Sequence, residues 1–134
     1  MKGYSLLELI AVIIILGILA TLAISQYGGY RERTIDKEAE AHLRLIQAAQ
    51  RIYRIENPAI YFPSSGSGQA EITDINDNLK LFLPNGANRR WNYQTFATGC
   101  TQAGRFNGPN TRTRCLNIDN DTVQEGSTCA AGCP

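Results

Sequence analysis

Four cysteines lie in the last 35 residues of this 134-residue chain, at Cys100, Cys115, Cys129 and Cys133. An even number of cysteines in a small polar region is typical of disulfides formed in an oxidising compartment. A zinc site is the alternative, but the spacings lack the closely spaced ligand pairs of zinc fingers, and the single histidine, His42, lies far upstream. We therefore expect disulfides here rather than a metal.

The remaining residues with chemical potential do not form a recognisable catalytic set. His42 has no obvious serine or cysteine partner, which favours a packing or surface role. Asp119 and Asp121 carry carboxylates two residues apart that could bind calcium, but the rest of an EF-hand loop is missing. We expect no enzymatic activity, no bound metal and no cofactor.

A short basic and aromatic stretch is the one candidate for nucleic-acid binding. Arg89 and Arg90 precede Trp91 and Tyr93, a combination of charges and rings that suits single-stranded DNA. The whole chain, however, has 13 basic and 12 acidic residues and a net charge of +1. Because no basic field supports the stretch, we expect no DNA binding by this chain alone.

The element at the start of the chain is strongly apolar. Between Tyr4 and Ile24, 17 of 21 residues are apolar, while the remainder of the chain is rather polar. About 20 apolar residues in a helix span a bilayer core of about 30 Å, and Tyr27 and Tyr30 would then lie at the interface. A removable signal peptide is the alternative, but no clear cleavage site follows the run. The pattern excludes an ordinary cytosolic globular enzyme.

Glu8 interrupts this apolar run. A carboxylate inside a membrane helix costs roughly 2.5–3.5 kcal/mol and usually marks a function. The only cations nearby in the sequence are Lys2 and a free α-amine. We therefore expect Glu8 to have a functional partner, or else to reach the membrane surface near the start of the helix.

Residues 1–20 resemble the N-terminus of a type IV pilin or pseudopilin precursor. The resemblance rests on Gly3, followed by an aromatic residue, Ser, Leu, Leu, Glu and an unbroken apolar run. It implies that a prepilin peptidase cuts between Gly3 and Tyr4 and methylates the new N-terminus at Tyr4. It also implies that Glu8 acts in assembly.

The physics of charge burial agrees with that role. Cleavage would leave a positive amine at Tyr4 in apolar surroundings, and a neighbouring subunit would offer Glu8 to it. Each charge alone is costly in a low dielectric, and pairing relieves both. Such a pair would favour assembly with a fixed axial register.

The chain divides into three expected parts. Residues 1–3 form the leader, residues 4–30 the transmembrane and filament-core half of a long helix, and residues 31–134 the periplasmic or extracellular head. Beyond residue 31 apolar residues recur every three or four positions, at Ile35, Ala39, Leu43, Ile46 and Tyr53. This spacing predicts an amphipathic continuation of the helix, which Asn57 and Pro58 end near residue 56.

The rest of the head reads as a small antiparallel sheet. Residues 91–98 and 112–118 are expected strands, joined through residues 104–110, with a third strand near 122–124. If the first two strands pair, Cys100 approaches Cys115, and Cys129 and Cys133 can close a tight ring. Four cysteines allow three pairings, and the sequence does not choose between them. The expected class is α+β, a long N-terminal helix packed on a small antiparallel sheet, as in the pilin fold.

The expected function is that of a structural subunit of a type IV pilus, a homo-oligomeric helical filament. The resemblance implies a prepilin peptidase, an assembly ATPase motor and a membrane platform protein as partners. It also implies an inner-membrane location with a single span before assembly and an extracellular filament afterwards. A pilus is preferred to a type II secretion pseudopilus because the head carries cysteines and lacks a convincing calcium loop. The sequence also leaves room for a membrane-anchored binding module that does not polymerise and, less readily, for a secreted enzyme.

Overall fold

The computed structural model describes residues 5–58, 60–64, 69–106, 112–119, 121–126 and 129, apart from the side chains at 25, 26 and 69. By its internal contacts the chain separates into two units, Met1–Asp36 and Lys37–Pro134.

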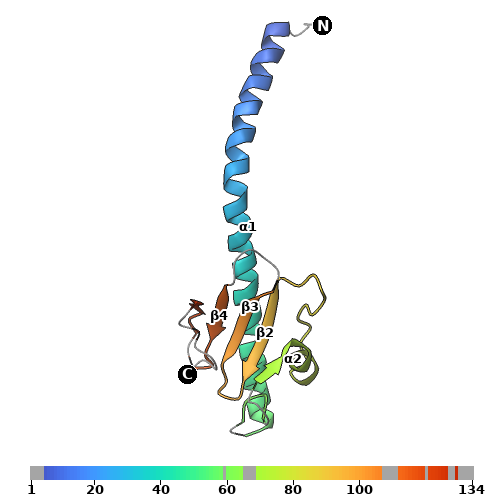
Figure 1. Cartoon of the computed structure of the whole chain (residues 1–134), viewed down its shortest axis with the longest axis vertical. Coiled ribbons are helices and arrows are strands. Elements are labelled where there is room, and N and C mark those ends of the chain that lie inside the picture. The colour runs from blue at the N-terminus through green and yellow to red at the C-terminus, as the bar shows by residue number, and fades with distance from the viewer. Residues whose placement is uncertain are drawn as a thin grey trace. The chain divides into compact units, whose positions relative to one another are not determined.

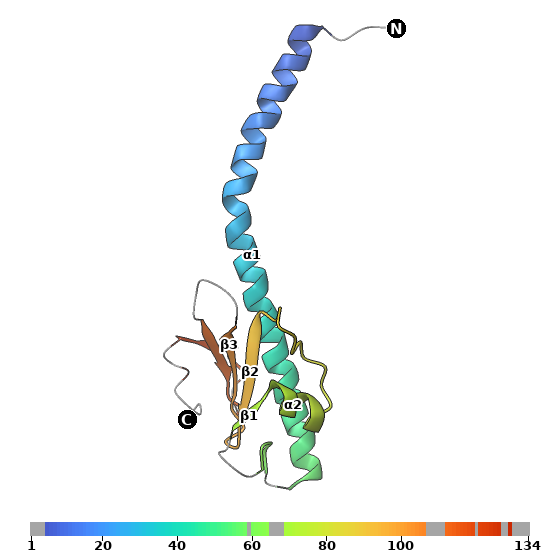
Figure 2. The same cartoon turned by 45° about the vertical axis from the view of Figure 1, so that its right-hand side comes forward.

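The chain has the α+β architecture expected from the sequence. A 51-residue helix, α1 (Leu6–Glu56), is followed in unit 2 by a five-stranded antiparallel sheet and one short helix. The elements after α1 are β1 (Gln69–Glu71), α2 (Ile72–Asn78), β2 (Trp91–Phe96), β3 (Thr101–Arg105), β4 (Thr113–Leu116) and β5 (Gln124–Glu125). Within unit 2, the last turns of α1 run along one face of the sheet (Figures 1 and 2).

The amphipathic stripe of α1 is buried, as its spacing predicts. Ala39, Leu43 and Ile46 have no exposed surface. The sheet contributes Trp91 and Tyr93 from β2, each 1% exposed. Burial of apolar surface at roughly 25 cal/mol per Å² is the main favourable contribution to this packing. The assignment of these three positions to the core face of the helix is therefore confirmed, while Tyr53 is only partly buried.

Helix α1 ends where the sequence predicts. Its last residue is Glu56, and Asn57 closes the final turn by donating from its backbone N–H to the Tyr53 carbonyl at 2.9 Å. The Asn57 side-chain amide donates to the same oxygen at 3.2 Å. Pro58 has no N–H with which to continue the helix.

The sheet differs from the expected pairing. Its order is β1-β2-β3-β4-β5, so β3 lies between the two strands that the sequence predicts to pair directly. In β2–β3 Trp91 faces Arg105, and in β3–β4 Thr101 faces Leu116. The sequence does not reveal β3 because Gln102, Ala103 and Gly104 have low strand propensity. Hydrogen-bonded neighbours on both sides overcome this preference.

A glycine makes the turn between β2 and β3 possible. Gly99 has a φ of +81°, a conformation that residues with a side chain rarely adopt. A Cβ at this position would lie 2.9 Å from Cγ2 of Ile118 and 3.0 Å from the ring of Tyr61. Both the backbone conformation and the close packing therefore require glycine.

A buried glutamine fastens the chain after α1 to the helix. Gln50 has no exposed surface. Its amide nitrogen donates to the Phe62 carbonyl at 2.5 Å, and its amide oxygen accepts from the Phe62 backbone N–H at 2.9 Å. Both backbone groups of Phe62 are satisfied by one side chain.

We predict that Gln50→Ala lowers the free energy of unfolding of the head by about 1–3 kcal/mol, because it leaves the Phe62 N–H and C=O buried without a partner. The measurement is a urea titration of the full chain in detergent, followed by the fluorescence of the single tryptophan, Trp91. Gln102→Ala is the matched control, since the side-chain amide of Gln102 makes no hydrogen bond to any residue that the structure describes. Equal losses in the two variants would contradict the prediction.

Candidate functional site

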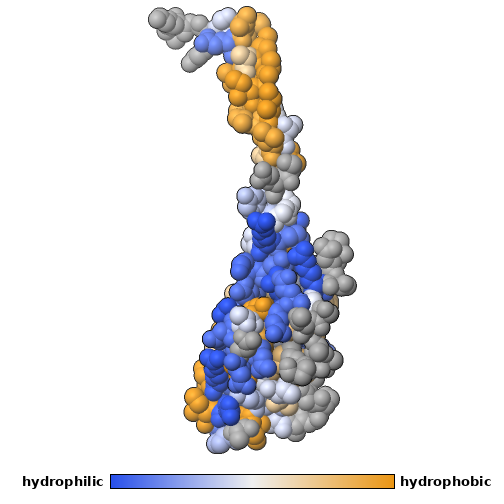
Figure 3. Space-filling view, turned by 90° about the vertical axis from the view of Figure 1, so that its left-hand side faces the viewer, coloured by the Kyte–Doolittle hydropathy of each residue, from blue (hydrophilic) through white to orange (hydrophobic). Residues whose placement is uncertain are grey.

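The first part of α1 presents an apolar surface that no described residue of its own unit covers. Large side chains from Leu6 to Ile24 are 43–77% exposed. In Figure 3 this part of the helix is largely orange, the colour of hydrophobic residues. Among the described residues, α1 is the one helix that is long and apolar enough to cross a membrane. A surface of this kind needs lipid or other apolar helices around it.

Glu8 lies in the first turn of this helix, next to its start. Its backbone N–H donates to the Ser5 carbonyl at 3.0 Å, which opens the helical hydrogen-bond ladder. A carboxylate in the first turn interacts favourably with the helix dipole. Within residues 5–36, the first basic residue is Arg31, about 34 Å further along the axis at about 1.5 Å per residue. The described part of the helix thus offers Glu8 no cation.

The predicted cleavage and methylation site precedes the described part of α1. Gly3 and Tyr4 lie outside the residues that the structure describes, as do Met1 and Lys2. Cleavage at Gly3–Tyr4 and methylation at Tyr4 stay predictions from the motif.

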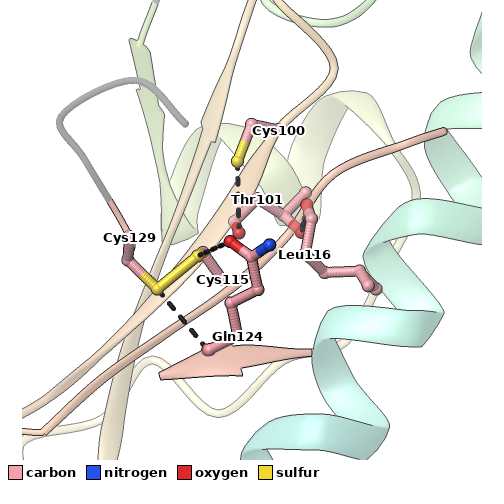
Figure 4. The surroundings of a disulfide bond; sticks show 6 residues. All are labelled: Cys100, Thr101, Cys115, Leu116, Gln124 and Cys129. Carbon is pink, nitrogen blue, oxygen red and sulfur yellow. Dashed lines mark hydrogen bonds between the residues drawn. A yellow bond between two sulfur atoms is a disulfide. The ribbon is translucent and has the colours of Figure 1, made fainter. Parts of the chain in front are cut away.

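The disulfides differ from the expected pairing. Cys115 on β4 is bonded to Cys129, with a Cα–Cα distance of 5.6 Å (Figure 4). Pairing of Cys115 with Cys100 and of Cys129 with Cys133 is therefore wrong. Cys100 is also disulfide-bonded. Cys133 lies outside the described residues.

The strand register explains why Cys115 does not bond to Cys100. Cys115 faces Gln102 on β3, two residues beyond Cys100, so the two cysteines are not direct cross-strand neighbours. On its other side Cys115 faces Gln124 of β5. The chain turns after β5 and returns Cys129 to within 3.5 Å of the Gln124 carbonyl oxygen, measured from its Sγ. The inserted strand β3 and the last turn carry no sequence signal strong enough to predict this pairing.

The basic and aromatic stretch is occupied by contacts within unit 2. Arg90 forms an ion pair with Glu38 at 2.9 Å, and the Arg89 guanidinium lies over the Phe106 ring at 3.5 Å. Trp91 and Tyr93 are almost completely buried. These two rings offer no exposed face on which a base could stack. The ion pair of Arg90 with Glu38 connects the stretch to α1.

The single histidine contributes to packing. His42 Nδ1 lies 2.7 Å from the Tyr93 hydroxyl oxygen, and the two rings meet edge to face. Burial raises the pKa of Tyr93, and the nearby Glu38 carboxylate raises it further. The phenol therefore stays protonated and keeps this contact between helix and sheet.

The two aspartates considered for calcium make contacts of a different kind. The Asp119 backbone N–H donates to the Asn117 side-chain oxygen at 3.3 Å, and Asp121 lies 3.5 Å from the guanidinium of Arg51. Arg51 also donates to the Ile118 carbonyl, at 3.2 Å. Among the described residues, no group of three or more His, Cys, Asp or Glu side chains could hold a metal ion.

Comparison with known proteins adds two relatives. The chain is 26% identical over 73 residues to the type II secretion system core protein G of Escherichia coli (strain K12), covering 54% of this chain and 49% of that protein. It is 31% identical over 67 residues to the protein of the same name from Pectobacterium carotovorum subsp. carotovorum, covering 50% and 42%. The chain thus spans less than half the length of these relatives. No family profile and no solved structure matches it.

The class of protein follows from the fold and the exposed apolar helix: the chain is pilin-like, as its first residues predict. The relatives are pseudopilins, and the identity over half of the chain supports its place in the pilin and pseudopilin family.

We predict that digestion without reduction, by trypsin and then by a protease that cuts after glutamate, leaves the peptide Cys115–Glu125 bonded to the peptide Gly126–Pro134. Mass spectrometry with fragmentation should place that bond between Cys115 and Cys129. A direct bond from Cys115 to the tryptic peptide Trp91–Arg105, which holds Cys100, would contradict the pairing. Reduction before digestion is the control and should release every peptide separately.

Proposed function

We propose that the chain is a structural subunit of a type II secretion pseudopilus, a filament of pilin-like subunits anchored at the inner membrane. The observation that carries this proposal is the exposed apolar half of α1, with a carboxylate in its first turn. The names of both relatives favour a secretion system over the type IV pilus indicated by the sequence. In this proposal the subunit acts by assembly and performs no catalysis.

Two environments satisfy the apolar half of the helix. Before assembly it lies in the inner membrane as a single span, since lipid covers side chains of this kind without cost. After assembly the same side chains pack against the helices of neighbouring copies. The exchange of lipid for protein leaves the apolar surface covered throughout.

Glu8 gives the assembled state its register. Once a prepilin peptidase has cut between Gly3 and Tyr4 and methylated Tyr4, the new N-terminal amine carries a positive charge. Glu8 of one copy pairs with that amine in the next, because each charge is costly in an apolar surrounding until it meets one of opposite sign. An assembly ATPase and a membrane platform protein supply the work of extraction from the membrane.

We predict that Glu8→Leu abolishes or strongly slows filament assembly while membrane insertion remains normal, because the pair is lost but the apolar length is kept. Glu71→Leu is the matched control, since it removes an exposed carboxylate from the head and should leave assembly unchanged. Filaments are counted by electron microscopy and the membrane-bound pool by immunoblotting. Normal filament number in Glu8→Leu would rule out the pairing.

We also predict the mass of the mature protein. Intact-mass spectrometry should find the loss of Met1–Gly3, the gain of one methyl group and the loss of four hydrogens for two disulfides. A product confined to the membrane and periplasmic fractions fits a pseudopilus, whereas an abundant product in the sheared surface fraction would favour a type IV pilus. A chain that still begins at Met1 would contradict processing and favour an anchored module that does not polymerise.

A further inference from the structure

Asn85 and Gly86 lie in the segment that connects α2 to β2, and both are exposed to solvent. The side-chain amide carbon of an asparagine can be attacked by the backbone nitrogen of the next residue. Glycine obstructs this attack least because it has no Cβ. Apart from its chain neighbours, no described residue has an atom within 4 Å of the place that a Cβ of Gly86 would occupy. The other Asn-Gly pair of the chain, Asn107-Gly108, lies outside the described residues.

Both reacting groups of this pair are free of competing hydrogen bonds. Neither the Gly86 N–H nor the Asn85 side-chain amide makes a hydrogen bond to any residue that the structure describes. An engaged amide would first have to give up its hydrogen bond, which costs free energy. The attacking nitrogen and the carbon that it attacks are therefore both available in the folded head.

Arg89 is placed to promote the loss of the proton from the Gly86 nitrogen. Its Nη1 donates to the Asn85 carbonyl oxygen at 3.4 Å and to the Gly86 carbonyl oxygen at 3.3 Å. The Asn85 carbonyl belongs to the same peptide group as the Gly86 nitrogen, so resonance spreads the negative charge of the deprotonated nitrogen onto this oxygen. A positive charge beside the oxygen stabilises that anion. The guanidinium is itself held over the Phe106 ring at 3.5 Å.

The segment keeps this arrangement because hydrogen bonds hold it on both sides of the pair. Before it, Asn76 of α2 donates from its side-chain nitrogen to the Leu83 carbonyl and accepts from the Leu83 N–H, both at 2.9 Å. After it, the Arg89 backbone N–H donates to the Gly86 carbonyl at 3.0 Å. Asn85 also lines a hollow of about 510 Å³, so water can reach its side chain and ammonia can leave.

We infer that Asn85 is a site of spontaneous deamidation in the folded protein. The deprotonated Gly86 nitrogen attacks the Asn85 side-chain carbon, and the new C–N bond closes a succinimide ring. The side-chain NH₂ group takes up a proton and leaves as ammonia. Water then opens the ring at either of its carbonyl groups. The products are aspartate with the original backbone and isoaspartate, in which the backbone runs through the former side chain.

Both products change the charge of the head. The chain has 13 basic and 12 acidic residues, so one new carboxylate makes the two numbers equal. The new charge lies on the residue that already accepts a hydrogen bond from Arg89. The modified protein is therefore a more acidic form of the same chain, which isoelectric focusing separates. This modification goes beyond the proposed function and does not depend on it.

Timed incubation of the full-length chain in detergent, in mildly alkaline buffer, tests the inference. Trypsin, used briefly in mild acid so that digestion adds no modification, releases the peptide Leu81–Arg89, which contains both Asn85 and Asn88. We expect Asn85 to be converted several-fold faster than Asn88, which precedes an arginine, and to yield both aspartate and isoaspartate. Mass spectrometry with electron-transfer dissociation distinguishes the two products. Equal rates at the two asparagines, or no conversion at Asn85, would overturn the inference.

Two variants test the parts assigned to Gly86 and Arg89. Gly86→Ala should nearly abolish the modification, because the added methyl group obstructs the attack and the loop has room for it. Arg89→Gln should slow the modification several-fold, because the charge beside the Asn85 carbonyl is lost. Arg44→Gln removes an exposed arginine of α1 and is the matched control, which should leave the rate unchanged. Unchanged fluorescence of Trp91 verifies that each variant is folded.

The same incubation in urea tests whether the fold permits the reaction. We expect Asn85 in the folded chain to react at least as fast as in the unfolded chain, where the contact with Arg89 is lost. A rate in the folded chain far below the rate in urea would overturn the inference, because the folded loop would then hold Asn85 away from the Gly86 nitrogen. An unchanged rate in Gly86→Ala would overturn the succinimide route.

Discussion

The apolar side chains between Leu6 and Ile24 need surroundings that their own unit does not supply. None of the described residues of unit 1 covers them, and their exposure in water would cost far more than the few kcal/mol by which a small domain is stable. Lipid and a bundle of like helices are the two surroundings that remove this cost. Under the proposed function, the helix moves from the first of these surroundings to the second, and the rest of the molecule has to be compatible with that movement.

In unit 2, polar contacts hold the loops on the second half of α1, so this part of the molecule does not depend on what surrounds the first half. Gln50 satisfies both backbone groups of Phe62, and Gln47 donates to the Asn117 and Ile118 carbonyls at 3.1 and 3.3 Å. The segment before β1 and the connection between β4 and β5 are thus both tied to α1. Buried glutamines that bond to backbone groups position these loops more specifically than apolar contacts alone.

The sequence predicts those features that depend on a regular period or on strong local chemistry. The helix, its buried stripe and its end at Glu56 follow from apolar spacing and from Pro58, and strands β2 and β4 follow from their composition. The sequence does not predict strand β3 or helix α2. Residues with low strand propensity, such as Gly104, acquire their structure from neighbours that are distant in the sequence. The cysteine pairing depends on the register that β3 creates, so it could not be obtained before the strand was known.

In the candidate site, too, some features can be predicted from the sequence and others cannot. Glu8 is conspicuous in the sequence because a charge within an apolar run is rare, and the structure adds only that no cation on the described helix approaches it. The exposure of Phe82 carries no sequence signal, since an apolar stretch that includes Leu79 and Leu83 is equally typical of a core segment. Only the placement of the chain by Asn76 separates the buried leucines from the exposed ring.

The disulfide between Cys115 and Cys129 also has a consequence for when the head reaches its final structure. The reducing cytoplasm keeps cysteines as thiols, so the bond forms only once the head has left it. Until then no disulfide holds the segment after β5 to β4, and β5 itself pairs with β4 through only two residues. Under the proposed function, newly made heads therefore cross the inner membrane before Cys115 and Cys129 are joined, and the bond closes on the oxidising side.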